Sequence, residues 1–484
     1  MKRLYNLFLF FLITVFFLLF SNNLSAQQKR IKNLPSNFQG FTLNGGSYEC
    51  GIYFEFSLSL LQYFPNISLD TAHGVNACGT TANMNNGTVY GMTFYGGTHN
   101  DGVIFQVLPN NESYFKRYNL DSANGSHPHG SLILASDSMF YGMTMDGGAN
   151  NLGVIFQFDP INIVYTKKID LTLSGGCSPF GGLIQAGDGY IYGLTKSGGA
   201  NNLGAIFQYD IVNNIYTKKI DLDSSTGSHP LGKMVQASNG HLYGMTKTGG
   251  ANNLGVIFDY DPVNNIYTDK VDFADSIGAN PYGSLLLASD GKLYGMTESG
   301  GTNNFGVIFQ YDYLTNTYID RYNLNISTGS GPWGSLIQIG NGMMYGMTSN
   351  GGYNYAGTIF SYDPIANIYT DIYDFVNGSG VFPIGNLIDE SGIYTGIEEE
   401  KNSDKMTLFP VLNNGIFNIV YPSLKLKSEL QLIDVAGRIV FRHELNNNET
   451  EQNINANELC NGMYFWEVVS DKGIEGKGKM TVLK

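Results

Sequence analysis

The chain has few charged residues and few cysteines for its length. Only 14% of its 484 residues are charged, and four are cysteine. With so few cysteines the fold cannot depend on disulfides, and no Cys-x-x-Cys or Cys/His spacing indicates a metal site. The 27 basic residues are outnumbered by 41 acidic ones, which gives a net charge of −14. Nucleic acids and anionic membranes need a basic face, so the sequence argues against both partners.

Long apolar runs are also missing after the N-terminus. Lys2 and Arg3 precede an apolar run from Leu7 to Phe20, and small residues follow as far as Ala26. This pattern predicts a secretory signal peptide over residues 1–26, removed on export. A signal anchor is the alternative, although the run is short for a membrane span. No Cys follows the run to indicate a lipoprotein anchor, so we expect an exported protein without a transmembrane segment after cleavage.

Glycine and aromatic residues are plentiful, with 61 Gly, 32 Tyr and 30 Phe. Such a composition favours an all-β protein with many turns, and the length predicts more than one domain. A tetrapeptide close to Tyr-Gly-Met-Thr recurs at a fixed period of 51 residues. Its copies begin at Tyr90, Tyr141, Tyr192, Tyr243, Tyr294 and Tyr345. A copy in register begins at Gln39, which makes seven, and such an array indicates one supersecondary unit repeated along the chain.

Each unit has the pattern of four short antiparallel strands. In the copy from Pro230 to Asp272 the predicted strands are "GKMVQAS", "HLYGMTK", "LGVIFDYD" and "IYTDKVDF". They are rich in Tyr, Phe, Ile and Val, and Gly, Asn, Asp or Pro bounds each of them. Four strands in a repeat of this length predict a propeller blade, with a solenoid as the alternative.

The two ends of the array favour the propeller. The first copy begins in mid-unit near Phe38, and the last ends in mid-unit after Phe382 to Ser391. Half a blade at each end completes one blade if the ring closes, whereas a solenoid requires capping repeats. We therefore predict a seven-bladed β-propeller over residues 34–397, closed by both termini. Phe38 to Thr42 and Gly392 to Ile397 are both candidates for the second strand of the closing blade.

A different pattern follows the array. Residues 398–404 have the composition of a solvated linker, and residues 405–484 alternate as short strands with hairpin turns, which predicts a small Ig-like β-sandwich. This stretch resembles the type A sorting domain of the type IX secretion system of Bacteroidetes, although "FPVLNNG" lacks the second proline of the usual opening motif. The matching positions are Pro410, Gly415, Asp434, Gly437, Arg438, Gly462 and Tyr464.

That resemblance implies that the domain engages the type IX machinery and directs passage across the outer membrane, so that the protein is secreted or held at the cell surface. An ordinary Ig-like accessory domain is the alternative. The repeats resemble the GloVer tandem-repeat family of bacterial extracellular proteins, through "LYGMT", "GGANNLGVIF" and "YDPVNN". That family implies little about mechanism, so the function has to be sought in the residues.

Residues that recur in every copy are poor candidates for catalysis, because an active site is one convergent constellation. We expect a structural role for the threonines that follow each Tyr-Gly-Met and for Asp210, Asp261, Asp312 and Asp363. Paired acids, nucleophile elbows and phosphate loops are absent, and Asp101, Asp146 and Glu298 are scattered. We predict no catalytic residue, no metal and no cofactor.

Positions that differ between copies are the better candidates. In a propeller, the loop after the second strand and the loop entering the next blade share one face. The residue between Pro and Gly in the entry loops varies, and it includes His129, Phe180, Tyr282 and Trp333. We hypothesise that these side chains line a binding mouth for a glycan or protein ligand. Packing in the hub is the simpler explanation of the same residues.

Two further patterns can be placed on this face. Cys50 lies in a loop after a second strand and Cys78 in the next entry loop, so a disulfide between them would brace the closing blade. His127 and His129 resemble a metal pair, but His229 repeats His127 and no carboxylates accompany them. We therefore expect a binding or interaction scaffold. The alternative is a carbohydrate-active enzyme, a glycosidase or lyase, which rests on fold analogy alone.

Overall fold

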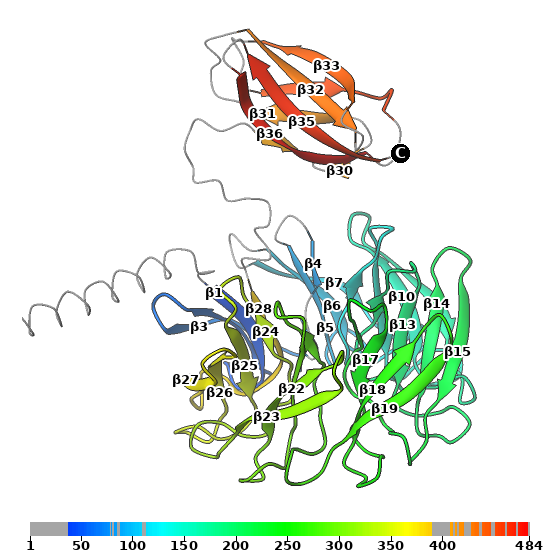
Figure 1. The fold of residues 1–484 in the computed structure, drawn as a ribbon, viewed down its shortest axis with the longest axis vertical. Helices are drawn as coiled ribbons and strands as arrows, with labels where there is room; N and C mark the ends of the chain where they lie inside the picture. The colour runs from blue at the N-terminus through cyan, green and yellow to red at the C-terminus, as the bar shows by residue number, and fades with distance from the viewer. Residues whose placement is uncertain are drawn as a thin grey trace, which may run out of the picture. The chain divides into compact units, whose positions relative to one another are not determined.

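The structure is a computed structural model of the whole chain, shown in Figure 1. It describes residues 37–77, 79, 82–84, 88–108, 113–389, 407–409, 412–413, 416–420, 427–434, 438–446, 451–459, 462–470 and 473–482. Two compact units are present, Met1–Thr395 and Gly396–Lys484. The predicted signal peptide and linker lie outside the described residues and stay predictions.

The first unit is built from seven four-stranded antiparallel sheets, counted over the described residues. Blade 1 combines β28 (Val381–Asp389) with β1 (Asn37–Asn44), β2 (Ile52–Ser57) and β3 (Gln62–Ser68). Blades 2 to 4 are β4 (Ala82–Asn83), β5 (Val89–Thr93), β6 (Val103–Leu108), β7 (Ser113–Asn119); β8 (Ile133–Leu134), β9 (Phe140–Thr144), β10 (Val154–Asp159), β11 (Val164–Asp170); and β12 (Ile184–Gln185), β13 (Ile191–Thr195), β14 (Ala205–Asp210), β15 (Ile215–Asp221). Blades 5 to 7 are β16 (Val235–Gln236), β17 (Leu242–Met245), β18 (Val256–Asp261), β19 (Ile266–Asp272); β20 (Leu286–Leu287), β21 (Leu293–Met296), β22 (Val307–Asp312), β23 (Thr317–Asn323); and β24 (Ile337–Gln338), β25 (Met344–Thr348), β26 (Thr358–Asp363), β27 (Ile368–Asp374).

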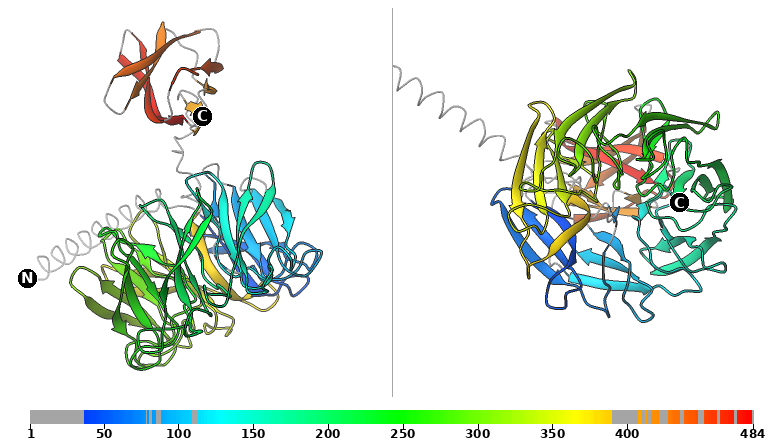
Figure 2. Two further views of the ribbon diagram at one scale, coloured as in Figure 1. Left: turned by 90° about the vertical axis from the view of Figure 1, so that its right-hand side faces the viewer. Right: turned by 90° about the horizontal axis from the view of Figure 1, so that it is seen from below.

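Both ends of the repeat array meet in blade 1. β1 pairs antiparallel with β28, from Phe38 opposite Asp389 to Asn44 opposite Val381. The N-terminal segment therefore supplies the second strand, whereas Gly392 to Ile397 lie outside the described residues. Figure 2 shows the blue N-terminal sheet beside the yellow C-terminal blade in one ring of sheets. The prediction of a seven-bladed propeller closed by both termini is confirmed.

The hydrophobic core lies between neighbouring blades. Seven clusters of buried side chains each join two adjacent sheets. One cluster joins Phe54 and Phe56 of blade 1 to Met347 and Ile359 of blade 7, so the last interface is packed like the others. Strand 2 of each blade is buried on both faces, which explains why Tyr, Met and Ile recur there. Closing the ring thus buries a hydrophobic face of every sheet.

The repeated threonines fasten the second strand to the third. The hydroxyl of Thr246 accepts a hydrogen bond from the Val256 amide at 3.1 Å and donates one to the Thr248 carbonyl at 3.0 Å. All seven threonines are completely buried and accept the equivalent amide bond. Each therefore satisfies a backbone amide that the β-ladder leaves free at the Gly-Gly loop. Their repetition reflects this structural role.

The repeated aspartates cap the turn between the third and fourth strands. In blade 4, Asp210 accepts hydrogen bonds from the Val212 and Asn213 amides and from the Asn213 side chain. Asp261, Asp312 and Asp363 accept the equivalent amide bonds. These bonds favour the ionised carboxylate and lower the pKa of Asp210 and Asp261. The pattern explains the Asp-x-x-Asn sequence as a turn motif.

The second unit contains two sheets. One is β29 (Thr407–Phe409), β31 (Ile416–Val420) and β34 (Glu451–Asn455), and the other is β30 (Leu412–Asn413), β36 (Gly473–Val482), β35 (Gly462–Ser470), β32 (Ser428–Asp434) and β33 (Ile439–Leu445). Residues from both sheets, among them Phe417, Ile454, Leu430 and Trp466, form one buried core. The predicted β-sandwich is therefore confirmed. β30 and β36 pair in parallel, so the unit is not a plain series of hairpins.

Candidate functional site

Seven glycines form the inner ring of the propeller. They are the glycines of the entry loops, which follow Pro-x in six copies and Ala77-Cys78 in the first: Gly79, Gly130, Gly181, Gly232, Gly283, Gly334 and Gly385. A Cβ added to any one of them would lie against the backbone carbonyl of the next, and the last, Gly385, faces Gly79. A side chain is thus excluded at this position in every blade, because the backbones approach too closely.

The described entry loops and Gly-Gly loops lie on one face of the propeller, as predicted. The entry loop of blade 5 contacts the Gly-Gly loop of blade 4, because the His229 amide donates to the Leu203 carbonyl at 2.9 Å. Equivalent bonds join Ser178 to Leu152 and Asn280 to Leu254. The variable residue of each entry loop therefore stands on the same face as the Gly-Gly loops, one position before the glycine ring.

The four aromatic side chains predicted as a mouth do come together. The His129 and Phe180 rings stack with centroids 3.3 Å apart, and the Phe180 and Tyr282 rings meet edge to face at 5.4 Å. The Tyr282 and Trp333 rings stack at 5.6 Å with planes 22° apart. All four side chains are half-buried, whereas Leu231 in the same ring is buried. The aromatic mouth, defined as His129, Phe180, Tyr282 and Trp333, thus keeps part of its surface open.

Charged side chains hold this mouth in place. The Trp333 indole N–H donates to Glu298 Oε1 at 3.0 Å, and Glu298 Oε2 pairs with Lys247 Nζ at 2.8 Å. Lys247 Nζ also lies 5.0 Å from the centre of the Tyr282 ring, and Lys196 Nζ lies 5.4 Å from that of Phe180. Both are cation–π contacts, which favour a fixed orientation of the rings. Lys196, Lys247 and Glu298 occupy one repeat position, directly after the repeated threonine.

His129 is neutral in this setting. Burial and the nearby Lys196 ammonium lower the pKa of its imidazole to about 3. The second histidine of the sequence pair, His127, points elsewhere: its Nδ1 lies 3.1 Å from Asp146 Oδ2, and its ring stacks on Phe94 at 5.1 Å. Both histidine rings contact Phe94, but only His127 is paired with a carboxylate. Among the described residues no group of three or more His, Cys, Asp or Glu is arranged to hold a metal.

A cavity of about 120 Å³ lies inside the mouth at the centre of the ring. Three successive layers line it: the variable residues, the glycine ring, and the residues that follow the glycines. The third layer contains Ser131, Gly182, Lys233, Ser284, Ser335 and Asn386. A cavity near 150 Å³ is known to hold a benzene-sized molecule, so this space fits a small chemical group rather than a whole ligand.

Lys233 is the one lysine or arginine among the described residues that line the cavity. Its Cδ lies 3.6 Å from the position that a Cβ on Gly182 would occupy, so its stem runs along the space that Gly182 leaves open. Burial lowers the pKa of its ammonium. No hydrogen bond or ion pair joins Nζ to a residue that the structure describes.

The cysteine prediction is not settled. Cys50 is a free thiol in this structure and donates to the Tyr48 carbonyl at 3.2 Å. Cys78 lies outside the described residues, so the disulfide stays a prediction. Of the scattered acids, Glu298 lies at the mouth and Asp146 pairs with His127, while the Asp101 carbonyl accepts the His127 amide.

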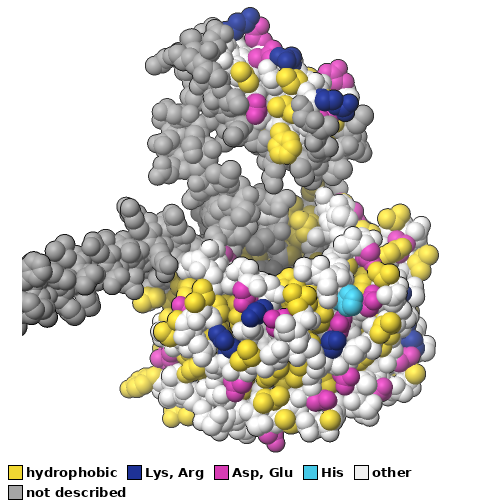
Figure 3. Space-filling view, viewed as in Figure 1, with side chains coloured by type: hydrophobic (Ala, Val, Ile, Leu, Met, Phe, Trp, Pro, Cys, Tyr) yellow, Lys and Arg dark blue, Asp and Glu magenta, His cyan; other side chains and the backbone are white. Residues whose placement is uncertain are grey.

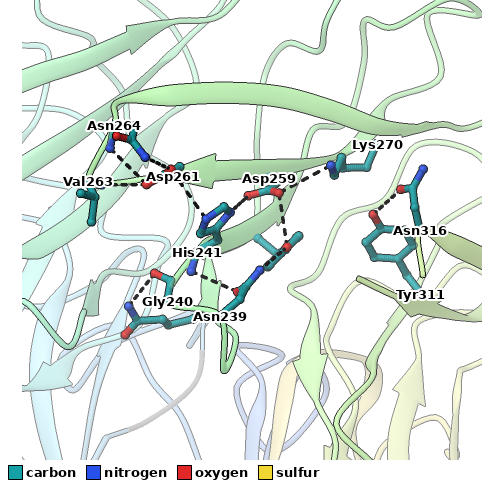
Figure 4. A network of polar contacts seen from close by, with 12 residues as sticks. Asn239, Gly240, His241, Asp259, Asp261, Val263, Asn264, Lys270, Tyr311 and Asn316 are labelled. Atoms are coloured by element: carbon teal, nitrogen blue, oxygen red, sulfur yellow. Dashed lines mark hydrogen bonds and ion pairs between the residues drawn. The ribbon is translucent and has the colours of Figure 1, made fainter. Parts of the chain in front are cut away.

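A second polar cluster was not predicted from the sequence. His241 in blade 5 lies 2.8 Å from Asp259 and 3.7 Å from Asp261, and Lys270 lies 3.6 Å from Asp259 (Figure 4). His241 and Asp259 both depart from the repeat, since most copies carry Gln in place of Asp259. This paired departure was a signal in the sequence. The four side chains mainly neutralise one another, and the cavity is lined by none of them.

Charged side chains are sparse in this chain and of both signs. Figure 3 shows one face of the molecule, on which a few acidic and basic side chains stand among uncharged polar and scattered hydrophobic ones. No helix among the described residues is long and apolar enough to cross a membrane. The cavity lysine therefore stands out against an acidic chain with a low density of charge.

Four of the predicted sorting-domain residues are described. Asp434 accepts hydrogen bonds from the Arg438 amide and from its side chain, at 2.9 and 2.8 Å. Gly462 begins β35, and the buried Tyr464 lies opposite Asp434 in the pairing of β32 with β35. These contacts place the motif around one turn and one strand pair. Pro410, Gly415 and Gly437 lie outside the described residues.

Comparison with solved structures shows the fold alone, because the identities are low. A putative 6-phosphogluconolactonase from Bacteroides fragilis is 16% identical with a TM-score of 0.50, covering 73% of this chain and 98% of that one. A quinonprotein alcohol dehydrogenase-like protein from Bacteroides thetaiotaomicron is 13% identical with a TM-score of 0.49, covering 74% and 78%. No curated protein matches the sequence at a significant level.

Family comparison identifies both units. The secretion system C-terminal sorting domain matches residues 407–482, which marks the chain for type IX export to the cell surface or the exterior. The Gloeobacter/Verrucomicrobia repeat matches residues 26–237 and 220–409. The chain therefore belongs to the Gloeobacter/Verrucomicrobia repeat family and carries a type IX sorting domain at its C-terminal end.

Proposed function

We propose that the propeller is a binding module that the sorting domain delivers outside the cell, and that the aromatic mouth receives a glycan or protein ligand. The observation that carries this proposal is the position of the mouth over a cavity at the centre of the ring. Four half-buried aromatic rings supply flat apolar faces with little conformational freedom, which is the composition of many interaction sites.

Hub packing alone explains the mouth less well. A residue that only fills the hub has no need of an exposed polar partner, and Leu231 at the same repeat position is buried without one. Trp333 instead is oriented by Glu298, which is itself fixed by Lys247. Such support orients a side chain whose surface remains open, as a recognition residue requires.

Catalysis has weaker support than binding. A glycosidase uses two carboxyl groups across the scissile bond. Glu298 is the one carboxylate contacting the described aromatic mouth, and it is already paired with Lys247 and Trp333. A binding function is therefore better supported than catalysis, and an enzyme remains the alternative.

The test is binding by the full chain carrying Trp333→Ala and Tyr282→Ala. Tyr353→Ala is the matched control, because Tyr353 is an aromatic of a Gly-Gly loop that is 85% exposed and lies outside the cavity lining. Ligands are sought by glycan array and pull-down, beside a hydrolysis screen. We expect the double variant to lose about tenfold or more in affinity for any ligand found, with an unchanged melting temperature.

Two results would contradict the proposal. One is a folded double variant that binds the ligand as well as the unaltered chain does. The other is equal loss of binding in Tyr353→Ala, since this would place the ligand on the loops instead of at the mouth.

A further inference from the structure

The cavity beneath the mouth has an unusual charge. The chain has a net charge of −14, yet the ammonium of Lys233 lies within the cavity lining without a described anionic partner. Lys247 is neutralised by Glu298, and Lys196 lies against the Phe180 ring with no described carboxylate beside it. The centre of the ring is therefore locally positive on a negative protein.

Lys233 differs in charge from the equivalent residues of the other described blades, and this difference requires an explanation. Equivalent positions in the other described blades hold Ser131, Gly182, Ser284, Ser335 and Asn386, all of them uncharged. Three neighbouring members of this layer are joined, because the Lys233 amide donates to Ser284 Oγ and the Ser284 amide to Ser335 Oγ. Lys233 joins this layer through its backbone amide, and its ammonium adds no described polar contact between blades.

Lys233 is partly buried, and an ammonium held away from water without a counter-ion destabilises a fold, because desolvation favours its neutral form. The adjacent Gly182 leaves room for the side chain and so lowers the steric cost. Other copies carry Ser at this position, so the repeat does not require a lysine. A lysine that reduces stability here is explained if it acts on a ligand.

We propose that Lys233 binds a carboxylate of the ligand, and that the ligand is an acidic saccharide. This rests on the proposed function, since it takes the mouth as the binding site. The cavity of about 120 Å³ fits a carboxylate group with part of one sugar ring. The stacked Tyr282 and Trp333 rings offer flat faces for the remaining sugar units.

A peptide carboxylate fits this site less well. Peptide ends are captured by sets of backbone amides or by an exposed strand edge. Here the inner glycines are closed by contact with one another, and the third layer uses its amides between blades. A single cation among aromatic rings instead matches a ring-shaped ligand with one acidic substituent.

The experiment is titration calorimetry on the full chain with two matched probes, β-1,4-linked mannuronate trisaccharide and β-1,4-mannotriose. We expect the acidic probe to bind about tenfold more tightly or better, a preference that Lys233→Gln removes and Lys233→Arg largely keeps. Raising the salt to ~0.5 M NaCl should weaken the acidic probe alone. Lys168→Gln is the control, because Lys168 lies on the outer strand β11.

Stability gives an independent check that Lys233→Gln is folded. Removing a partly buried charge that has no described partner should leave the melting temperature unchanged or raise it. A lower melting temperature would show that the ammonium has a structural partner, and this would overturn the proposal.

Other outcomes separate this proposal from the proposed function. Equal binding of both probes, each lost in Trp333→Ala, would overturn the role of Lys233 and leave the mouth as a binding site. Binding of neither trisaccharide would overturn the acidic saccharide. A pentapeptide with a free carboxyl terminus that binds through Lys233 while its amide and both trisaccharides do not would overturn it in favour of a peptide ligand.

Discussion

Two adjacent positions of the entry loop differ in how much they vary among the seven blades. The entry-loop glycine is the same in every copy, and the residue before it differs in every copy: Cys78, His129, Phe180, Leu231, Tyr282, Trp333 and Ile384. The glycine faces its neighbour's backbone, so every blade imposes the same requirement. The preceding side chain in the described copies lines the cavity, where the surroundings differ from blade to blade.

This contrast teaches how a closed repeat gains a specific site. Identical copies alone would give a ring of seven equivalent surfaces. Asymmetry enters at positions where the repeat tolerates different side chains, and around the cavity these are the residues before the glycine, after the glycine and after the repeated threonine. Stability and recognition are thereby assigned to different residues of the same loop, and substitutions can test that division.

The largest expected effect is at the glycine ring. Gly232→Ala places a methyl group against the Gly283 carbonyl, and because both are backbone-defined positions the two blades must move apart. We expect a loss of about 3 kcal/mol in the free energy of unfolding. Chemical denaturation measures it. Gly340→Ala is the control, since nothing lies within 4 Å of its Cβ position, and an equal loss in both variants would refute the close-approach explanation.

A smaller loss is expected at the repeated threonine. Thr246→Val keeps the volume but leaves the Val256 amide buried without its hydroxyl acceptor. This should reduce stability by about 2 kcal/mol. Thr268→Val on the exposed side of β19 serves as the control and should stay within about 0.5 kcal/mol of the unaltered chain. If both substitutions prove neutral in thermal unfolding, the repeated hydroxyl has no structural role.

The smallest effect concerns His129 and depends on pH. Its pKa is about 3 in the folded chain, against 6.5 for an ordinary histidine, so the unfolded chain binds a proton first as the pH falls. Stability contributed by the neutral imidazole is therefore complete above pH 6.5 and is lost progressively down to pH 3. Between pH 7.5 and pH 5 the unaltered chain should lose about 1.5 kcal/mol more than His129→Phe.

Denaturant titrations of the two proteins at both pH values measure that difference. Other titrating groups cancel, because both proteins share them. A parallel pH dependence would mean that His129 is protonated and solvated in the fold, contrary to its place between Phe180 and Lys196.

Much of the fold was predictable from the 51-residue period, because a repeat fixes strand number, turn positions and shared faces at once. The second strand of the closing blade could not be predicted, since Phe38 to Thr42 and Gly392 to Ile397 both have strand patterns. The strand pairing identifies Phe38 to Thr42 as part of that strand. β1 pairs with β2, and Thr42 makes the contact that the repeated threonine makes in the second strand of every blade.

The aromatic mouth was predicted by comparing one repeat position between copies, and its lysines and glutamate were missed. Lys196, Lys247 and Glu298 could have been found by the same comparison one residue after the threonine. Lys233 was harder, because its significance depends on Gly182 in the preceding blade, which leaves room for the lysine side chain, and a period alone does not reveal this three-dimensional relation.

The pairing of β1 with β28 has a consequence for the synthesis and folding of this protein. Every other blade consists of consecutive strands and can form as its own residues appear, whereas blade 1 waits for Asp389 to meet Phe38. Until then β1 has an open edge, which is a hazard for aggregation. The sorting domain begins after that closing strand, at residue 407. A chain broken off before the ring can close therefore also lacks its export signal, so the order of the two units selects complete rings for delivery.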